Sequence, residues 1–276
     1  MLGMNRFFTS LVGLLFITAA LITWSILEAK HRPIGPAVST EENSANLTTG
    51  AENSEDAGET TNQPAYLIAL YGDSMQDSMQ EHLAYLTTAL EEKYSQTEFT
   101  IYNYGIGAQD AEAGLARFNN QFGNRGRTYQ AITAVQPDVI IIGSFAYNPF
   151  NPPSLERHTA ALTALVQKAQ QVTNSVYLIV EIAPLRAGFA QGPKGVAFSP
   201  EQATENSQNV IDQLENTVII GRSLGVPLIN VYADSIKTPE DKEGFRQYIS
   251  QDDGIHPSAQ GYALMAEKIV ETIELP

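Results

Sequence analysis

The sequence contains no cysteine and few basic residues. Its 276 residues include 16 Lys and Arg against 31 Asp and Glu, which gives a formal net charge of −15. Without cysteine the chain can form no disulfide, hold no zinc through thiolates and carry out no thiol chemistry. The shortage of basic residues argues against a phosphate-binding surface for nucleic acid and against a basic face for anionic lipid. We therefore expect no nucleic-acid partner.

Charge is absent altogether from one long stretch near the N-terminus. Residues 7–27 read FFTSLVGLLFITAALITWSIL, and a membrane span needs about 20 mostly apolar residues. The run is longer than the roughly 7–15 apolar residues of a signal peptide, and no A-x-A cleavage site follows it. We interpret residues 1–32 as a single-pass membrane anchor rather than a cleaved signal peptide. The flanking Lys and Arg residues do not fix its orientation.

Residues 33–64 lack both basic and aromatic residues and are rich in Ser, Thr, Asn, Gly and Glu. Such a segment buries too little apolar surface to offset the entropy of ordering it. This composition predicts a disordered acidic linker. The remaining residues, 65–276, then form a single folded domain that the linker holds away from the membrane.

Apolar runs and helical patterns alternate along this domain. The runs typical of strands are residues 65–71, 99–104, 138–145, 176–182 and 226–232. The helical patterns lie between and after them, at residues 79–94, 111–122, 155–172, 200–224 and 258–274. Five alternations predict an α/β fold with a five-stranded parallel sheet covered by helices on both faces. Ligands bind such sheets outside the carboxyl ends of the strands.

Ser74 follows the first predicted strand directly, in the stretch AYLIALYGDSM. A serine at this place can be an ordinary helix N-cap. It can also be a nucleophile, provided that a base is present to take its proton.

A candidate base lies near the C-terminus, in the stretch QDDGIHPS. Asp253 and His256 are three residues apart in a tight segment, so that one short turn presents both side chains on the same side. His256 can then accept the proton of Ser74 while Asp253 orients the imidazole. Two alternatives remain open here: a simple helix start capped by Ser258, and a metal site formed by Asp252, Asp253 and His256.

These two stretches resemble conserved blocks of a known family. GDS after a first strand and DGIHP before a last helix are similar to the first and last blocks of the SGNH/GDSL hydrolase superfamily of serine esterases, lipases and acyltransferases. The family's second block supplies a glycine after the second strand. The stretch NYGIG resembles this block, and Gly105 is the counterpart of that glycine. The third block, Gly-x-Asn-Asp, is similar to the stretch around Asn148, where Ala146 and Pro149 replace the family's Gly and Asp.

The resemblance implies a three-layer α/β/α sandwich of the flavodoxin-like type and a Ser-His-Asp triad that needs no cofactor. It assigns Ser74 as the nucleophile, His256 as the base and Asp253 as its partner. The backbone N–H groups of Ser74 and Gly105 and the amide of Asn148 would form the oxyanion hole. Tyr147 is the competing donor if the third block is shifted by one residue.

Other candidate residues are expected to be structural. Ser223 lies in GRSLG, but a helix precedes it and a strand follows, the reverse of a nucleophile elbow. We interpret His82 and His158 as surface histidines, Asp77 as a solvated carboxylate in a first helical turn, and residues 187–199 as a Gly-rich surface loop.

These features together predict a membrane-anchored serine ester hydrolase whose catalytic domain lies outside the cytoplasm. Its expected substrate is a small-molecule or glycan ester, with removal of an O-acyl group from a cell-surface glycan as the leading interpretation. Two alternatives remain: an O-acyltransferase that uses the same triad, and a catalytically silent binding module in which the altered third block has lost the oxyanion hole.

Overall fold

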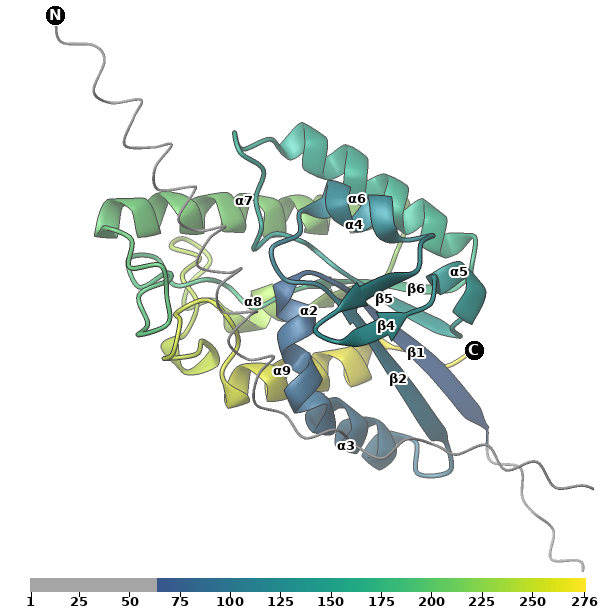
Figure 1. Cartoon of the computed structure of the whole chain (residues 1–276). Coiled ribbons are helices and arrows are strands. Elements are labelled where there is room, and N and C mark those ends of the chain that lie inside the picture. The colour runs from purple at the N-terminus through teal and green to yellow at the C-terminus, as the bar shows by residue number, and fades with distance from the viewer. Residues whose placement is uncertain (1–63) are drawn as a thin grey trace, which may run out of the picture.

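The computed structural model describes residues 64–276, which form a five-stranded parallel sheet with helices on both faces (Figure 1). The strands of this sheet are β1 (Ala65–Gly72), β2 (Glu98–Gly105), β5 (Val139–Gly143), β6 (Ser175–Val180) and β7 (Leu228–Asn230). Their order across the sheet is β2-β1-β5-β6-β7, and all neighbouring pairs are parallel. The α/β class and the five-stranded parallel sheet are therefore confirmed.

The helices form a layer on each side of the sheet. The main helices are α3 (Leu83–Lys93), α4 (Ala111–Arg117), α6 (Leu155–Gln170), α7 (Pro200–Leu224) and α9 (Ala259–Thr272). Helices α3 and α9 pack against each other below the sheet in Figure 1, and α4, α6 and α7 pack above it. The shorter helices are α2 (Ser74–Ser78), η1 (Met79–His82), α5 (Ile132–Val135), α8 (Val231–Ser235) and η2 (Arg246–Tyr248).

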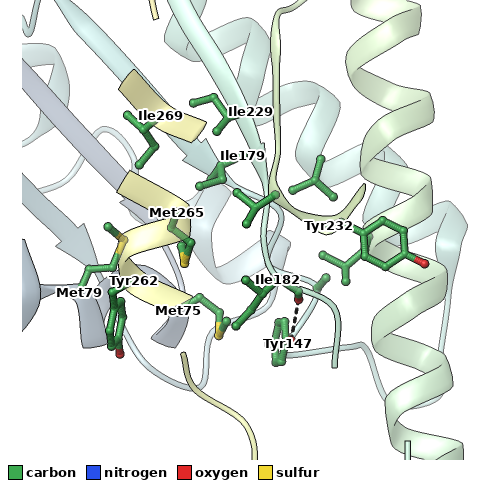
Figure 2. Close-up of a cluster of buried hydrophobic side chains, with 14 of the residues drawn as sticks. Met75, Met79, Tyr147, Ile179, Ile182, Ile229, Tyr232, Tyr262, Met265 and Ile269 are labelled. Carbon is green, nitrogen blue, oxygen red and sulfur yellow. Dashed lines mark hydrogen bonds between the residues drawn. The ribbon is translucent and has the colours of Figure 1, made fainter. Parts of the chain in front are cut away.

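The central strands are buried on both faces. Ile68 and Leu70 of β1 join the core cluster that contains residues of α3 and α9, and the intervening Ala69 and Tyr71 join the cluster that contains residues of α6. Successive side chains of a strand point to opposite faces, so one apolar run supplies both cores. Figure 2 shows part of the first core, where methionines of α2, η1 and α9 meet the ends of the strands.

The structure departs from the predicted elements in several places. The helix predicted at 111–122 ends at Arg117, and the short helices α5 and η2 were not predicted. The helical region predicted at 79–94 begins earlier and is divided into α2, η1 and α3. An antiparallel hairpin of β3 (Phe122–Asn124) and β4 (Arg127–Tyr129) was not predicted. The last predicted strand keeps three residues as β7, because Asn230 caps α8 by accepting from the N–H of Ala233.

The predicted anchor and acidic linker lie outside the described residues, apart from Pro64. Within residues 64–276, none of the helices has the length and apolar character required to cross a bilayer.

Candidate active site

Ser74 is the first residue of α2, just past the carboxyl end of β1, which lies between β2 and β5 in the sheet. Asp73 caps the helix, because its Oδ1 accepts the N–H of Met75 at 2.9 Å. The Ser74 N–H belongs to the first turn, where N–H groups have no acceptor within the helix. Asp73 and Met75 are buried, whereas Ser74 between them is partly exposed. The turn therefore presents the Ser74 side chain at the edge of the sheet.

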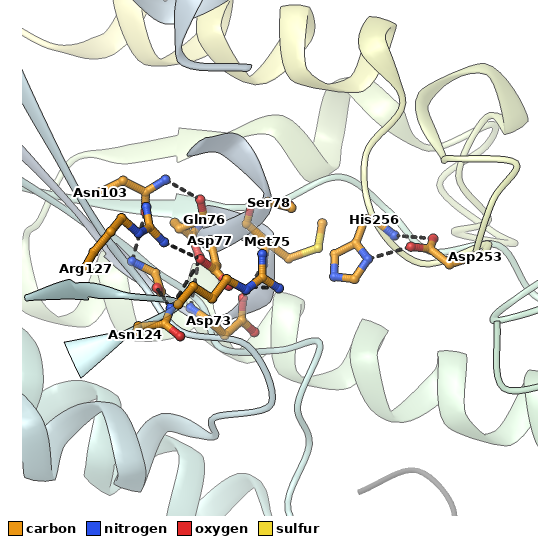
Figure 3. A network of polar contacts seen from close by, with 12 residues as sticks. Asp73, Met75, Gln76, Asp77, Ser78, Asn103, Asn124, Arg127, Asp253 and His256 are labelled. Atoms are coloured by element: carbon orange, nitrogen blue, oxygen red, sulfur yellow. Dashed lines mark hydrogen bonds and ion pairs between the residues drawn. The ribbon is translucent and has the colours of Figure 1, made fainter. Parts of the chain in front are cut away.

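Asp253 and His256 form a hydrogen-bonded pair, as the sequence spacing predicts (Figure 3). His256 Nδ1 lies 2.7 Å from Asp253 Oδ2, and Asp253 Oδ1 accepts the backbone N–H groups of Ile255 and His256 at 2.8 and 3.0 Å. Burial alone would raise the pKa of Asp253, but these hydrogen bonds and the nearby imidazole hold that pKa below its ordinary value. The ionised carboxylate selects the tautomer with hydrogen on Nδ1, which leaves Nε2 of His256 as a base.

His256 lies on the same side of the sheet edge as Asp73 and Met75, the two residues that flank Ser74 (Figure 3). Burial raises the pKa of Asp73, and the N–H of Met75, the amide of Asn148 and the charge of His256 each oppose that rise. His256 is therefore close enough to act electrostatically on the residue next to Ser74. Figure 3 shows its imidazole on the side of Asp253 that faces Asp73 and Met75.

Asn148 also reaches this turn. Its Nδ2 donates to Asp73 Oδ2 at 2.9 Å, and its backbone N–H donates to the carbonyl of Phe145 at 3.2 Å. An amide nitrogen carries two hydrogens, so one N–H of Nδ2 remains for a substrate oxygen. The competing candidate Tyr147 is 7% exposed and donates its hydroxyl to the carbonyl of Ile182 at 2.8 Å (Figure 2). Asn148 is thus the better placed donor of the two.

The predicted role of Gly105 does not fit its position. The Gly105 N–H donates to Asn103 Oδ1 at 2.9 Å, and a Cβ at Gly105 would lie 2.1 Å from the backbone nitrogen of Asp77. Gly105 lies beneath α2, where its missing side chain lets the helix approach β2. Gly107 is nearer the nucleophile, because a Cβ there would lie 3.7 Å from Ser74 Cβ. The motif NYGIG contains both glycines. They differ in that Gly105 is the last residue of β2, whereas Gly107 lies beyond the strand.

Asp77 is not the solvated carboxylate that its position in the sequence suggests. Its side chain is 2% exposed and pairs with Arg127 at 3.1 Å and Arg125 at 3.4 Å. Asn124 Nδ2 donates to Asp77 Oδ1 at 3.3 Å and to the Gly105 carbonyl at 3.2 Å. These contacts attach the β3–β4 hairpin to α2, one helical turn after Ser74.

The two histidines predicted to lie on the surface differ from each other. His158 is completely buried, and its Nδ1 lies 3.0 Å from Asn216 Nδ2, which can only donate. Its Nε2 therefore carries the hydrogen and donates to the Ser144 carbonyl at 2.8 Å. Burial lowers the pKa of His158 more than this hydrogen bond raises it, so the ring is neutral. His82 is partly exposed and stacks on Tyr262, with 4.2 Å between the ring centroids.

The Gly-rich loop 187–199 is a support for the Asp253–His256 segment rather than a free surface loop. The Ala190 N–H donates to the Gly254 carbonyl at 3.1 Å, and the Lys194 N–H donates to the Asp252 carbonyl at 2.6 Å. A Cβ on Gly192 would lie 2.2 Å from the carbonyl of Asp252. The glycine is needed because two backbones meet there without room for a side chain.

The alternative metal site does not assemble. The Asp252 carboxylate pairs with Lys194 Nζ at 2.8 Å on the exposed side of the turn. Across residues 64–276 there is no group of three metal-ligating side chains. Ser223, the serine of the elbow-like sequence GRSLG, is an exposed residue of α7. Its hydroxyl donates to the Ile220 carbonyl at 2.8 Å.

Residues that sequence reasoning missed lie behind the nucleophile turn. Glu181, Gln76 and Ser144 form a buried hydrogen-bonded group beneath Asp73. Glu181 lies near the end of the apolar run VYLIVEI. A carboxylate at the end of a buried strand is the sequence feature that could have indicated a functional residue.

Ser74 at the end of β1, the His256–Asp253 pair and the Asn148 amide are the kinds of group that a serine hydrolase uses. A family model, the GDSL-like lipase/acylhydrolase, matches residues 36–269. The chain belongs to this family, and membership supports a serine ester hydrolase.

Solved structures share the fold at low sequence identity. A GDSL-like lipase from Bacteroides thetaiotaomicron VPI-5482 is 16% identical, with a TM-score of 0.52 over 75% of this chain and 86% of that one. A lipase/acylhydrolase from Enterococcus faecalis is 18% identical, with a TM-score of 0.52 over 75% and 94%. An acetylxylan esterase from Geobacillus stearothermophilus is 16% identical, with a TM-score of 0.52 over 76% and 94%. No curated protein sequence matches the chain.

Proposed function

We propose that the protein hydrolyses O-acyl esters through a triad of Ser74, His256 and Asp253. The observation that carries this proposal is the 2.7 Å contact between His256 Nδ1 and Asp253 Oδ2 at the sheet edge where Ser74 begins α2. It supplies an oriented base that lies near enough to Asp73, the residue before Ser74, to affect the pKa of that carboxyl group.

The reaction follows from the roles of these groups. Ser74 Oγ attacks the ester carbonyl carbon while His256 Nε2 takes its proton, and the carbonyl oxygen becomes an oxyanion. His256 then returns the proton to the departing alcohol, which leaves an acyl group on Ser74. A water molecule attacks this acyl-enzyme while His256 takes its proton. His256 then returns that proton to Ser74 Oγ as the acyl bond breaks, and the carboxylic acid departs.

The oxyanion is stabilised by N–H groups around Ser74. We assign the Ser74 N–H and the second N–H of Asn148 Nδ2 to this role. We assign Gly107 as the backbone donor in place of Gly105, because Gly107 lies nearer Ser74 and the Gly105 N–H is already bonded to Asn103. The placement of Asn148 beside Asp73 favours an enzyme over a silent binding module, because the amide is retained despite the altered third block.

The substrate class and location are part of the same proposal. We propose that residues 1–32 anchor the chain in a membrane and that residues 33–64 hold the esterase domain outside the cytoplasm, near cell-surface glycans. The fold is shared with an acetylxylan esterase, which is consistent with an O-acyl glycan as substrate.

The test is covalent labelling of the full chain with an organophosphonate probe, applied to intact cells and followed by fractionation and peptide mass spectrometry. We expect label on Ser74 and recovery in the membrane fraction. Release of acetate from an acetylated xylo-oligosaccharide would then support glycan deacylation. Label on another residue, or none, would contradict the triad, and label in the soluble fraction would contradict the anchor.

A further inference from the structure

Glu181 lies at the centre of the polar group behind the nucleophile. It follows β6 directly and is completely buried. Its Oε1 accepts from Gln76 Nε2 at 2.7 Å and from the Ser144 N–H at 3.1 Å. The Ser144 hydroxyl contacts the other oxygen, Oε2. One carboxyl group thus connects the residues that follow β1, β5 and β6.

Gln76 carries this connection to the turn that holds Ser74. Its Oε1 accepts the Asp73 N–H at 3.2 Å, which completes the cap of α2. A Cβ on Gly72 would lie 1.9 Å from Gln76 Oε1, and a Cβ on Gly143 would lie 2.6 Å from the same atom. The glycines at the ends of β1 and β5 therefore make room for Gln76 to reach Glu181.

Ser144 carries the connection to the loop that holds Asn148. Its Oγ accepts the Ala146 N–H at 3.1 Å, and its carbonyl accepts from His158 Nε2 at 2.8 Å. The next residue, Phe145, has φ of +58°, a conformation that costs energy for a residue with a side chain. The contacts of Ser144 hold this loop in the shape that directs the Asn148 amide to Asp73.

The charges around Glu181 favour its neutral form. Burial, and then the charge of Asp73, raise the pKa of Glu181 to about 7, against the hydrogen bonds from Ser144 and Gln76. The charges of Arg117 and His256 act on Asp73. Asp73 also accepts N–H groups from Met75 and Asn148, so it is the carboxylate of the pair.

The positive charge near this pair lies beside Asp73 rather than Glu181. Arg117 Nη2 donates to the Gly72 carbonyl at 2.7 Å, and the charge of Asp73 is among those that oppose the fall in the pKa of Arg117 caused by burial. Tyr147 and His158 are neutral, because burial raises the pKa of the phenol and lowers that of the imidazole. A second ionised carboxylate at Glu181 would therefore face Asp73 without a cation of its own.

We propose that Glu181 is a positioning residue of the esterase site: while protonated, it fixes the Ser74 turn and the Asn148 loop relative to each other. This inference rests on the function proposed above, because its effect is on the alignment of nucleophile and oxyanion donor. Ionisation of Glu181 places two negative charges at the strand ends and loosens that alignment.

The test compares the full-length wild type with Glu181→Gln, Glu181→Ala and the matched control Glu112→Gln. The amide in Glu181→Gln reproduces the neutral acid, whereas Glu181→Ala leaves Gln76 and Ser144 without their acceptor. Glu112 makes an exposed ion pair with Arg157, so its variant makes the same chemical change away from the site. The kcat and KM for a short-chain aryl ester are measured across about pH 5–9, together with the rate of phosphonate labelling.

We expect Glu181→Ala to lower kcat about tenfold or more with little change in KM, because a small misplacement of reacting groups is costly. Glu181→Gln should retain wild-type kcat below pH about 7 and should lack the fall that wild type shows above it. Glu112→Gln should follow wild type at every pH. If Glu181→Ala does not fold, the wild type and Glu181→Gln still give the comparison.

Thermal melting gives a readout that does not depend on turnover. Folded Glu181 binds its proton more tightly than the unfolded chain does. The stability it contributes is therefore complete below its ordinary pKa of 4.5 and is lost as the pH rises to about 7. Over that interval the melting temperature of wild type should fall relative to Glu181→Gln.

The outcomes separate the two proposals. A wild type that neither turns over esters nor labels at Ser74 would refute the proposed function, whatever the variants do. An active wild type whose pH profile matches that of Glu181→Gln would refute the role of Glu181. Parallel melting curves for these two proteins across the interval would also refute it.

Discussion

The two halves of the site are held in place by different means. On the nucleophile side, Asp73 is 1% exposed and Glu181 is fully buried, and their partners come from the ends of neighbouring strands. On the base side, the His256 and Asp253 side chains are 12% and 15% exposed. They lie on a loop that rests against a second, Gly-rich loop. The sheet positions the proposed nucleophile, whereas loop-to-loop contact positions the proposed base.

The largest expected effect tests whether the two halves act as one unit. Ser74→Ala and His256→Ala should each lower kcat by about 10⁴-fold or more, because neither residue works without the other. The double variant should lose no more than either single one. The measurements are kcat for a short-chain aryl ester and the melting temperature, which should change little. Additive losses would mean that the two residues do not share one reaction.

The next effect concerns the link between Asn148 and Asp73. Asn148→Ala should lower kcat by about 10²–10³-fold, the usual value of one oxyanion donor. KM should change less, because the interaction strengthens in the transition state. Steady-state kinetics on the same ester provide the measurement.

Tyr147→Phe is the matched control for Asn148→Ala. It removes a buried hydroxyl that donates to the Ile182 carbonyl, so it should lower the melting temperature and leave kcat nearly unchanged. Removing one buried hydrogen bond typically costs about 1 kcal/mol. A normal kcat in Asn148→Ala would exclude that residue from the oxyanion hole.

A smaller effect on kcat is expected at the contact between the Asp253–His256 segment and the Gly-rich loop 187–199. Gly192→Ala places a methyl group 2.2 Å from the Asp252 carbonyl, so one of the two loops must move. We expect kcat to fall about tenfold to 100-fold, since a displacement of about 1 Å can cost that much. Gly123→Ala is the control, because a Cβ there meets its nearest neighbour, the Arg127 carbonyl, at 3.6 Å. Equal activity of the two variants would show that the loop contact does not position His256.

The contrast between the buried sheet and the surrounding loops also explains which parts of the fold could be predicted from the sequence. The five apolar runs predict the sheet because strands buried on both faces leave a continuous signal. The β3–β4 hairpin leaves almost none, since its three-residue strands contain glycine and arginine and one of their contacts is with Asp77, about 50 residues earlier.

The site divides in the same way. The Asp253–His256 contact is local, so its spacing predicts it. The partners of Glu181 are separated from it by 105 and 37 residues, and only the sheet brings them together. The choice between Gly105 and Gly107 also requires the end of β2, because both belong to the same short motif.

The smallest expected effect is at Ser223. It has the sequence of a nucleophile elbow, but it lies neither at the carboxyl end of a strand nor in the loop that holds His256. It lies in the last turn of α7, and a strand follows it instead of preceding it. Its hydroxyl donates to the Ile220 carbonyl in its own helix, and such a bond contributes little to helix stability. Ser223→Ala should therefore leave kcat and phosphonate labelling unchanged and should slightly raise the melting temperature, because alanine has the higher helix propensity. Parallel kinetics, labelling and melting on Ser223→Ala and Ser74→Ala make the comparison. A loss of labelling in Ser223→Ala, with labelling retained in Ser74→Ala, would move the nucleophile from the end of β1 to α7.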